Sequence, residues 1–363
     1  MNKKYRGIVS CVLVLCFILI GCTPASSVEE EAGDVGVHTD LIRVGFSQLG
    51  AESDWRRANT ASIRSALSKE AGYQLYFEDA QQKQANQAMA IRRFIQQGVD
   101  YIVLAPATEV GWDNVLTEAK NAKIPVILVD RSIDVKDPSL FTCWIGSDFR
   151  LEADKVTSWL EQYCKQKNIS PSELHIAHLQ GSPGASAQIG RSEGLMEAAK
   201  KNQWDVVATE DGDFTQAKGK EVMMEILSEH SGVNVVYSEN DNMALGAIEA
   251  IEEAGKKAGK NIKKGDILIV SFDGVSKDAM QKLWEGKIAC IGECYPMHGP
   301  KVINAIDMLQ AGEKPHKLSY VSEGIYSADS TITQVSVGKK DYPVTIVTSE
   351  WIRNRSTFSE TEP

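Results

Sequence analysis

The segment IRVGF (residues 42–46) leads directly into the polar stretch SQLGAESDWR (residues 47–56). A short apolar run next to polar and glycine residues is typical of a buried strand, and residues 56–71 then follow a helical pattern. A strand that passes through a polar loop into a helix is the unit from which parallel α/β sheets are built. The fold is therefore expected to consist of repeats of this unit.

The same unit recurs through both halves of the chain. In the first half, further strands are predicted at 73–77, 101–104 and 125–129, and further helices at 85–97 and 112–122. In the second half, strands are predicted at 175–179, 206–209, 233–237 and 267–272, and helices at 187–201, 216–229 and 243–254. Alternating strands and helices predict a parallel sheet in each half.

We predict a doubly wound α/β fold of two parallel-sheet lobes joined by a hinge. The apolar segments 141–146 and 288–294 are interpreted as strands that pass from one lobe to the other, and 342–347 as a further apolar run. The predicted first lobe consists of residues 41–145 and 295–325. The predicted second lobe consists of residues 146–294 and 326–358.

The N-terminus has the pattern of an export signal. Basic residues at positions 3, 4 and 6 precede an apolar run over residues 8–20, which ends at Gly21 and Cys22. The run is short for a membrane span, and a small residue before a cysteine is typical of a bacterial lipoprotein signal. We predict a signal peptide over 1–21, lipid attachment at Cys22 and a flexible polar tether over 22–40; an uncleaved anchor is the alternative. Either arrangement places the protein on the extracytoplasmic face of the membrane.

Composition and motifs exclude several functions. The chain has 39 basic and 49 acidic residues, a net charge of −10, and no basic stripe interleaved with aromatics, so nucleic acid is not an expected partner. No phosphate-binding loop and no serine-hydrolase motif occur, and we predict no cofactor. Cysteines 143, 164, 290 and 294 do not have zinc-site spacing and are interpreted as buried free thiols rather than disulfides, so we predict no metal.

Polar side chains follow the predicted strands at their carboxyl ends. In a parallel sheet ligands bind at that edge, so these residues are candidates for a binding site. Carboxylates accept hydrogen bonds from sugar hydroxyls, arginine and asparagine donate to them, and an aromatic face packs on the sugar ring. Trp55 is interpreted as such a stacking residue, with a core position as the alternative, and Phe214 fits either role.

Many segments of the chain resemble one family, the type I periplasmic binding proteins of sugar ABC transporters, and most of all its galactofuranose-binding members. The resemblance covers about residues 44–299. It rests on GFSQ (45–48), ES (52–53), WR (55–56), QQKQ (81–84), NQ (86–87), QGVD (97–100), GW (111–112), IPV (124–126), DRSID (130–134), GDFT (212–215), KGK (218–220), ND (240–241) and FDG (272–274).

The resemblance implies a monomeric protein that captures a monosaccharide between its lobes and delivers it to an ABC permease. The implied ligand-binding residues are Glu52, Ser53, Asp54, Trp55, Arg56, Asp130, Arg131, Arg191, Asn240 and Asp273. Asp54 stands where the resemblance leads us to expect glycine, which would add a carboxylate near the sugar.

Two other functions fit parts of the sequence. A glycosidase needs paired carboxylates, but Arg56, Arg131 and Arg191 are expected to lower the pKa of nearby carboxyl groups and to leave no general acid, so we predict no enzyme activity. A sugar sensor that signals to a membrane receptor or kinase would use the same fold and remains the alternative to transport.

Overall fold

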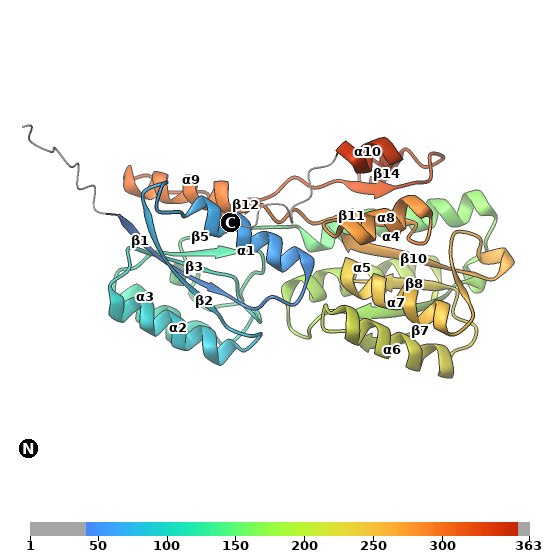
Figure 1. Cartoon of the computed structure of the whole chain (residues 1–363), viewed down its shortest axis with the longest axis horizontal. Coiled ribbons are helices and arrows are strands. Elements are labelled where there is room, and N and C mark those ends of the chain that lie inside the picture. The colour runs from blue at the N-terminus through green and yellow to red at the C-terminus, as the bar shows by residue number, and fades with distance from the viewer. Residues whose placement is uncertain (1–40, 355–363) are drawn as a thin grey trace, which may run out of the picture. The chain divides into compact units, whose positions relative to one another are not determined.

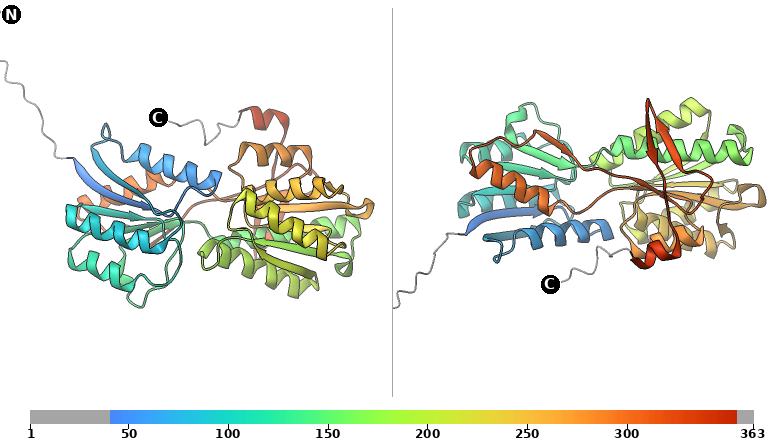
Figure 2. Two further views of the ribbon diagram at one scale, coloured as in Figure 1. Left: turned by 60° about the horizontal axis from the view of Figure 1, so that its bottom comes forward. Right: turned by 90° about the horizontal axis from the view of Figure 1, so that it is seen from above.

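The computed structural model describes residues 41–354. The predicted signal peptide, the lipid-attachment residue Cys22 and the tether lie outside this range, as do residues 355–358 of the predicted second lobe. Figures 1 and 2 show two open sheets, each with helices packed beside it. Within residues 41–354 no helix combines the length and the apolar character needed to cross a membrane.

The first sheet has six parallel strands in the order β12-β5-β4-β3-β1-β2. Helices α1 and α9 pack on one face and helices α2 and α3 on the other. The strands are β1 (Ile42–Gln48), β2 (Tyr73–Asp79), β3 (Tyr101–Leu104), β4 (Val126–Val129), β5 (Cys143–Gly146) and β12 (Leu318–Tyr320). The helices are α1 (Asp54–Ala66), α2 (Gln84–Gln97), α3 (Asp113–Asn121) and α9 (Gly299–Gln310).

The second sheet has eight strands in the order β16-β13-β11-β10-β8-β6-β7, with β9 paired to β10, and only β11 and β13 are antiparallel neighbours. Helices α6, α7 and α8 cover one face and α4 and α5 the other. The strands are β6 (His175–Gln180), β7 (Asp205–Asp211), β8 (Val235–Ser238), β9 (Lys257–Ala258), β10 (Asp266–Asp273), β11 (Cys290–Glu293), β13 (Ile325–Ser327) and β16 (Thr345–Ile346). The helices are α4 (Phe149–Lys167), α5 (Ser186–Asn202), α6 (Gln216–Glu229), α7 (Asp241–Glu253) and α8 (Lys277–Glu285).

The C-terminal part of the described chain stays with the second lobe. Strands β14 (Gln334–Val337) and β15 (Lys340–Pro343) form a hairpin on α4, and the short helix α10 (Ser349–Asn354) follows. Hydrogen bonds join α4 to the hairpin, from the Ser158 hydroxyl to the Ser336 carbonyl and from the Gln162 amide to the Gln334 carbonyl.

The predicted two-lobe α/β fold is confirmed, but the crossings between the lobes differ from the prediction. Strands β5 and β11 do not pass between lobes, because each is a full member of one sheet. The chain crosses instead in the short segments that follow, at residues 147–148, 294–298 and 321–324. Residue 325, which we had placed in the first lobe, begins β13 of the second sheet. We propose these three crossings as the lobe borders.

A candidate ligand-binding site between the lobes

A small cavity lies where the carboxyl ends of the two sheets face each other. Its volume is about 30 Å³, which leaves room for only about one or two water molecules between the walls. Residues of both lobes line it: Glu52, Ser53, Trp55, Arg56, Asp130, Arg131, Phe149, Ala187, Arg191, Phe214, Asn240, Asp273 and Cys294. All but one of the ten residues predicted from the sequence therefore meet around one cavity.

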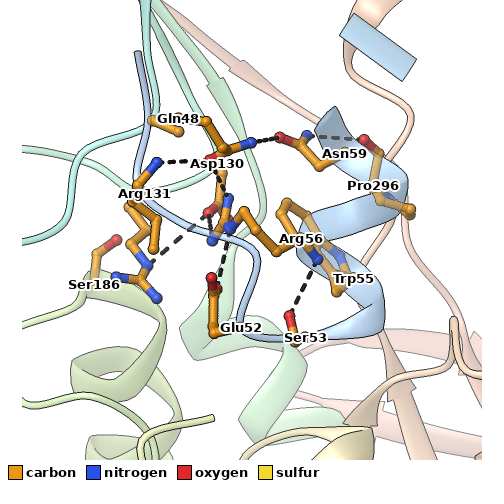
Figure 3. Close-up of polar contacts among 12 residues, drawn as sticks. Gln48, Glu52, Ser53, Trp55, Arg56, Asn59, Asp130, Arg131, Ser186 and Pro296 are labelled. Carbon is orange, nitrogen blue, oxygen red and sulfur yellow. Dashed lines mark hydrogen bonds and ion pairs between the residues drawn. The ribbon is translucent and has the colours of Figure 1, made fainter. Parts of the chain in front are cut away.

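The guanidinium group of Arg56 organises the first-lobe wall (Figure 3). Its Nη2 donates to Asp130 Oδ2 at 2.6 Å, its Nε to Glu52 Oε1 at 3.1 Å and its Nη1 to Gln48 Oε1 at 3.3 Å. Burial opposes the charge, but Asp130 and Glu52 outweigh it and raise the pKa of Arg56 above its usual value. The second oxygen of Glu52 is buried without a hydrogen-bond partner among the described residues, which leaves it free to accept from a ligand.

Helix α1 presents Trp55 and Arg56 from its first turn because Ser53 caps it. The Ser53 hydroxyl accepts a hydrogen bond from the backbone N–H of Arg56 at 3.1 Å, which satisfies one of the open donors at the helix start. The Trp55 indole N–H donates to the carbonyl of Cys294 at 2.8 Å, and the ring packs into the apolar cluster of the second lobe. Trp55 is therefore both a wall of the cavity and a packing contact between the lobes.

Asp130 and Arg131 follow β4 and point into the cavity from a constrained backbone. Asp130 has a φ of 65°, in the left-handed region that aspartate tolerates better than most residues and that often occurs at functional sites. The Arg131 Nη1 donates to the Ala107 carbonyl at 2.9 Å, whereas its buried Nε makes no hydrogen bond among residues 41–354. Burial and the nearby Arg56 lower the pKa of Arg131 to about 10, so it is still charged at neutral pH.

A second arginine organises the opposite wall in a similar way. Arg191 on α5 lies 2.9 Å from a Glu152 carboxylate oxygen and 3.1 Å from Asp273 Oδ1, and it also donates to the Glu239 carbonyl. Its side chain is only 2% exposed. Each lobe therefore brings one buried arginine, held by two carboxylates, to the cavity.

The carboxyl group of Asp273 behaves differently from our expectation. Burial raises its pKa to about 7, and the opposing effect of Arg191 does not cancel this. Burial likewise raises the pKa of Glu152. The prediction that the arginines lower the pKa of all neighbouring carboxyl groups is therefore wrong for these two, and that argument does not exclude a general acid.

Asn240 and Asp54 have their side chains engaged by the protein. The Asn240 Oδ1 accepts from the Met243 N–H at 2.9 Å and caps α7, while its Nδ2 donates to the Phe214 carbonyl at 3.0 Å. Asp54 does not line the cavity. It pairs with Arg57, and across the lobes its N–H donates to Asn242 Oδ1 at 3.0 Å. The Asp54 carboxylate accepts from the Asn242 Nδ2 at 3.4 Å, so the added carboxylate that we expected near the sugar is a contact between the lobes, and we leave Asp54 out of the proposed binding set.

The cavity also has walls that the sequence did not single out. Phe149 begins α4 with its ring beside Arg191, at 5.6 Å, and Ala187 and Cys294 complete the lining. Phe214 was expected either to line the cavity or to pack in the lobe, and it does both: it lines the cavity and its residue is only 5% exposed. The Arg131 guanidinium of the other lobe lies 5.4 Å from its ring centroid. Our sequence analysis considered only polar residues after strands, so it did not identify Phe149 as a cavity residue. The position of this phenylalanine directly after the first crossing, residues 147–148, could have indicated it.

Cysteines 143, 164, 290 and 294 are free and buried, as predicted. Cys294 lies near two carboxylates: potential metal-ligand atoms of Glu152, Cys294 and Glu323 are all within 4.8 Å of one another. Positive charge is already present there, because Arg191 pairs with Glu152 and the Lys155 Nζ donates to the Glu323 carbonyl at 2.7 Å. We therefore assign no cation to this group.

The arrangement of two lobes around one cavity defines the class of protein. Residues 44–314 match the model of the periplasmic binding protein domain, and the chain belongs to that family, whose members bind substrates for transport and are not enzymes. Over 294 residues it is 41% identical to the galactofuranose-binding protein YtfQ of Escherichia coli (strain K12), covering 80% of this chain and 89% of that protein.

Solved structures show the same relationship. A protein from Mycobacterium smegmatis in complex with β-D-fucofuranose matches with a TM-score of 0.74 and 42% identity over 79% of this chain and 91% of that one. The binding protein of the arabinose ABC transporter from Shewanella sp. ANA-3, bound to α- and β-L-arabinofuranose, matches with a TM-score of 0.71 and 42% identity over 78% and 91%.

The raised pKa of Asp273 predicts a specific pH dependence of stability. The pKa is about 4 in an unfolded chain and about 7 in the folded one, so the folded state holds this proton more tightly. The stabilisation is complete below pH ~4 and is lost as the pH rises through 7. The free energy of unfolding of the wild type should therefore fall relative to Asp273→Asn over this window, by at most about 1.4 kcal/mol per pH unit. Denaturant titrations at several pH values would measure it; parallel curves for the two proteins would contradict the assignment.

Proposed function

We propose that the protein captures one monosaccharide in its furanose form between the lobes and delivers it to an ABC permease. The observation that carries the proposal is the pair of buried arginine–carboxylate clusters, Arg56 with Asp130 and Arg191 with Asp273, on opposite walls of one small cavity. The proteins of known ligand at about 40% identity support the furanose form, since their names or bound ligands are galactofuranose, fucofuranose and arabinofuranose.

The free polar atoms of the cavity suit a ring that carries several hydroxyl groups. A hydroxyl donates and accepts at once, so it can donate to the open oxygen of Glu52 and accept from the open Nε of Arg131. The aromatic residues Trp55, Phe149 and Phe214 offer apolar surface to the C–H groups of the ring. The cavity of about 30 Å³ favours a single sugar unit over an oligosaccharide, and the walls must move apart to admit even one unit.

Direct contacts between the lobes support capture by closure. The Ser132 N–H of the first lobe donates to the Ser186 hydroxyl of the second at 3.0 Å, and the Glu109 N–H donates to the Gly184 carbonyl at 3.0 Å. Together with the Asp54–Asn242 contact, these bonds hold the cleft shut around the cavity. A ligand that bonds to both walls would favour this closed state by its differential affinity.

The route of export and the membrane partner belong to the same proposal. A lipid on Cys22 would hold the protein at the extracytoplasmic face of the membrane, next to the permease that receives the sugar. Signalling to a membrane receptor or kinase is the alternative partner. A screen for interaction with purified permease and kinase in nanodiscs separates the two, because only one of them should bind the sugar-loaded form.

The ligand class can be tested by calorimetry and NMR. L-Arabinose, D-fucose or D-galactose is expected to bind with a stoichiometry of one and to raise the melting temperature; a Kd near 1 μM corresponds to about −8 kcal/mol. With sugar labelled with ¹³C at C1, the bound signal should be that of a furanose. A bound pyranose would refute the ring form, and a thermal shift only with amino acids or nucleosides would refute the sugar class.

Arg131 should be needed for binding, because its buried guanidinium faces the cavity with an unused donor. Replacing it by alanine removes a charge-assisted hydrogen bond, so the Kd measured by calorimetry should rise at least about tenfold. The matched control is Arg57→Ala, since that side chain is 58% exposed and pairs only with Asp54 in the described structure. Its Kd should stay within about threefold of the wild type. Equal effects of the two substitutions would place the site elsewhere.

Replacing Cys22 by alanine should release the protein from membranes, because in this proposal the lipid on that residue provides the whole attachment. Fractionation of cells expressing either form, followed by immunoblotting, would measure the distribution. Unchanged sedimentation of Cys22→Ala with the membranes would rule out the lipid anchor.

A further inference from the structure

Each crossing between the lobes contains one residue that separates chain hydrogen-bonded to one lobe from chain hydrogen-bonded to the other. We call this residue the turning point of the crossing. In the second crossing this residue is Cys294. Its N–H donates to the Asp273 carbonyl of the second lobe at 3.0 Å, and its carbonyl accepts from the Trp55 indole of the first lobe at 2.8 Å. Cys294 is therefore the residue of this crossing at which the lobes would turn against each other.

The first crossing turns at Ser147. The residue before it, Gly146, still belongs to β5, and the residue after it, Asp148, caps α4 of the second lobe by accepting from the Leu151 N–H at 3.0 Å. Ser147 itself is 2% exposed.

The third crossing turns at Ser322. On one side, the Val321 N–H donates to the Gly146 carbonyl at 2.9 Å and stays with the first lobe. On the other side, the Glu323 carbonyl accepts from the Lys155 Nζ of α4 at 2.7 Å and belongs to the second lobe.

The side chain of Glu323, which directly follows the third turning point, contacts the other two crossings. Its Oε1 accepts from the Ser147 hydroxyl at 2.6 Å and from the Tyr295 N–H at 2.8 Å. Tyr295 directly follows Cys294 and lies on its first-lobe side. The Ser147 hydroxyl is also 3.3 Å from the Cys294 sulfur. One carboxylate oxygen of Glu323 therefore accepts hydrogen bonds from two places. One is Ser147 in the first crossing, and the other is Tyr295, on the first-lobe side of the second crossing.

We infer that Glu323 clasps the hinge in its closed geometry and so sets the affinity for the ligand without touching it. Rotation about Ser147, Cys294 and Ser322 changes the separation of Glu323 and Tyr295, so the hydrogen bond from the Tyr295 N–H belongs to the closed arrangement and is lost as the lobes open. The bond from Ser147, which is itself a turning point, holds the Glu323 carboxylate in place for it. Apparent affinity is proportional to the population of the binding-competent state. A device that stabilises the closed state therefore tightens binding.

The clasp is also in contact with the ligand-binding wall. Glu152 lies within 4.8 Å of both Cys294 and Glu323, and the same carboxylate pairs with Arg191 at 2.9 Å. A displacement of Arg191 or Glu152 on ligand binding would therefore change the contacts of Cys294 and Glu323 at the hinge.

The experiment compares Glu323→Ala, Glu323→Gln and the control Glu293→Ala. Glu293 is also a glutamate next to the hinge, but the hydrogen bonds of its carboxylate among residues 41–354 come from the Gly324 N–H at 2.7 Å, next to β13, and from the Tyr326 hydroxyl of β13, not from the first or second crossing. Two readouts are needed: the Kd for L-arabinose, and the distance distribution without sugar between spin labels at the exposed positions Lys69 and Lys200, one on each lobe. The Kd readout rests on the proposed function, whereas the distance readout does not.

Glu323→Ala should raise the Kd about tenfold and shift the sugar-free distances away from the closed form, because it removes the Tyr295 bond that belongs to that form and the Ser147 bond that orients the carboxylate. Glu323→Gln keeps an acceptor oxygen and should stay within about threefold of the wild type. Glu293→Ala should leave the distances unchanged. An unchanged Kd for Glu323→Ala, or a raised Kd with unchanged distances, would overturn the clasp. If the wild type binds none of the sugars, the proposed function fails, and the distances alone decide the inference.

Discussion

The burial of two arginine side chains on facing walls is the constraint on which the rest of the structure depends. Arg56 and Arg191 are each at most 3% exposed, and a buried guanidinium is tolerated only where carboxylates and carbonyls pair with it. Glu52 and Asp130 serve one arginine, and Glu152 and Asp273 the other. Removing one partner would leave an uncompensated buried charge, so each cluster fixes the strand ends and helix starts that supply it.

The two clusters are prepared before any ligand arrives, because every ion pair within them joins residues of the same lobe. A ligand in the cavity would therefore connect the two clusters by hydrogen-bonding to both of them. Within residues 41–354, the cavity between them leaves a carboxylate oxygen of Glu52 and the Nε of Arg131 without a hydrogen bond, although this Nε lies 4.0 Å from Asp130 Oδ2. Such atoms are costly when buried unless a ligand or water satisfies them. Closure of the hinge therefore becomes most favourable when a polyhydroxylated ligand of the right size lies between the walls.

Much of this arrangement could be predicted from the sequence, because parallel strands place the residues after their carboxyl ends at one edge. That rule points to Asp130, Arg131 and Asp273, because they directly follow the predicted strands 125–129 and 267–272; the family resemblance implied the same three residues. It could not find Phe149 or Glu152, since these lie at the start of α4, a helix that our pattern analysis did not predict. It also could not show that Asp54 turns away from the cavity, because the direction of a side chain in a helix start depends on contacts with the other lobe, here Asn242. Burial likewise decided the pKa of Asp273, and burial depends on the closed fold.

The most direct test of the account is a crystal structure of the protein with bound L-arabinose or D-galactose. The account predicts one furanose in the cavity, with hydroxyl groups bonded to Arg131 or Asp130 of the first lobe and at the same time to Arg191 or Asp273 of the second. A sugar bonded to one lobe only, or one bound in the larger hollow that Lys257, Lys260 and Asp329 line at the second lobe, would contradict it.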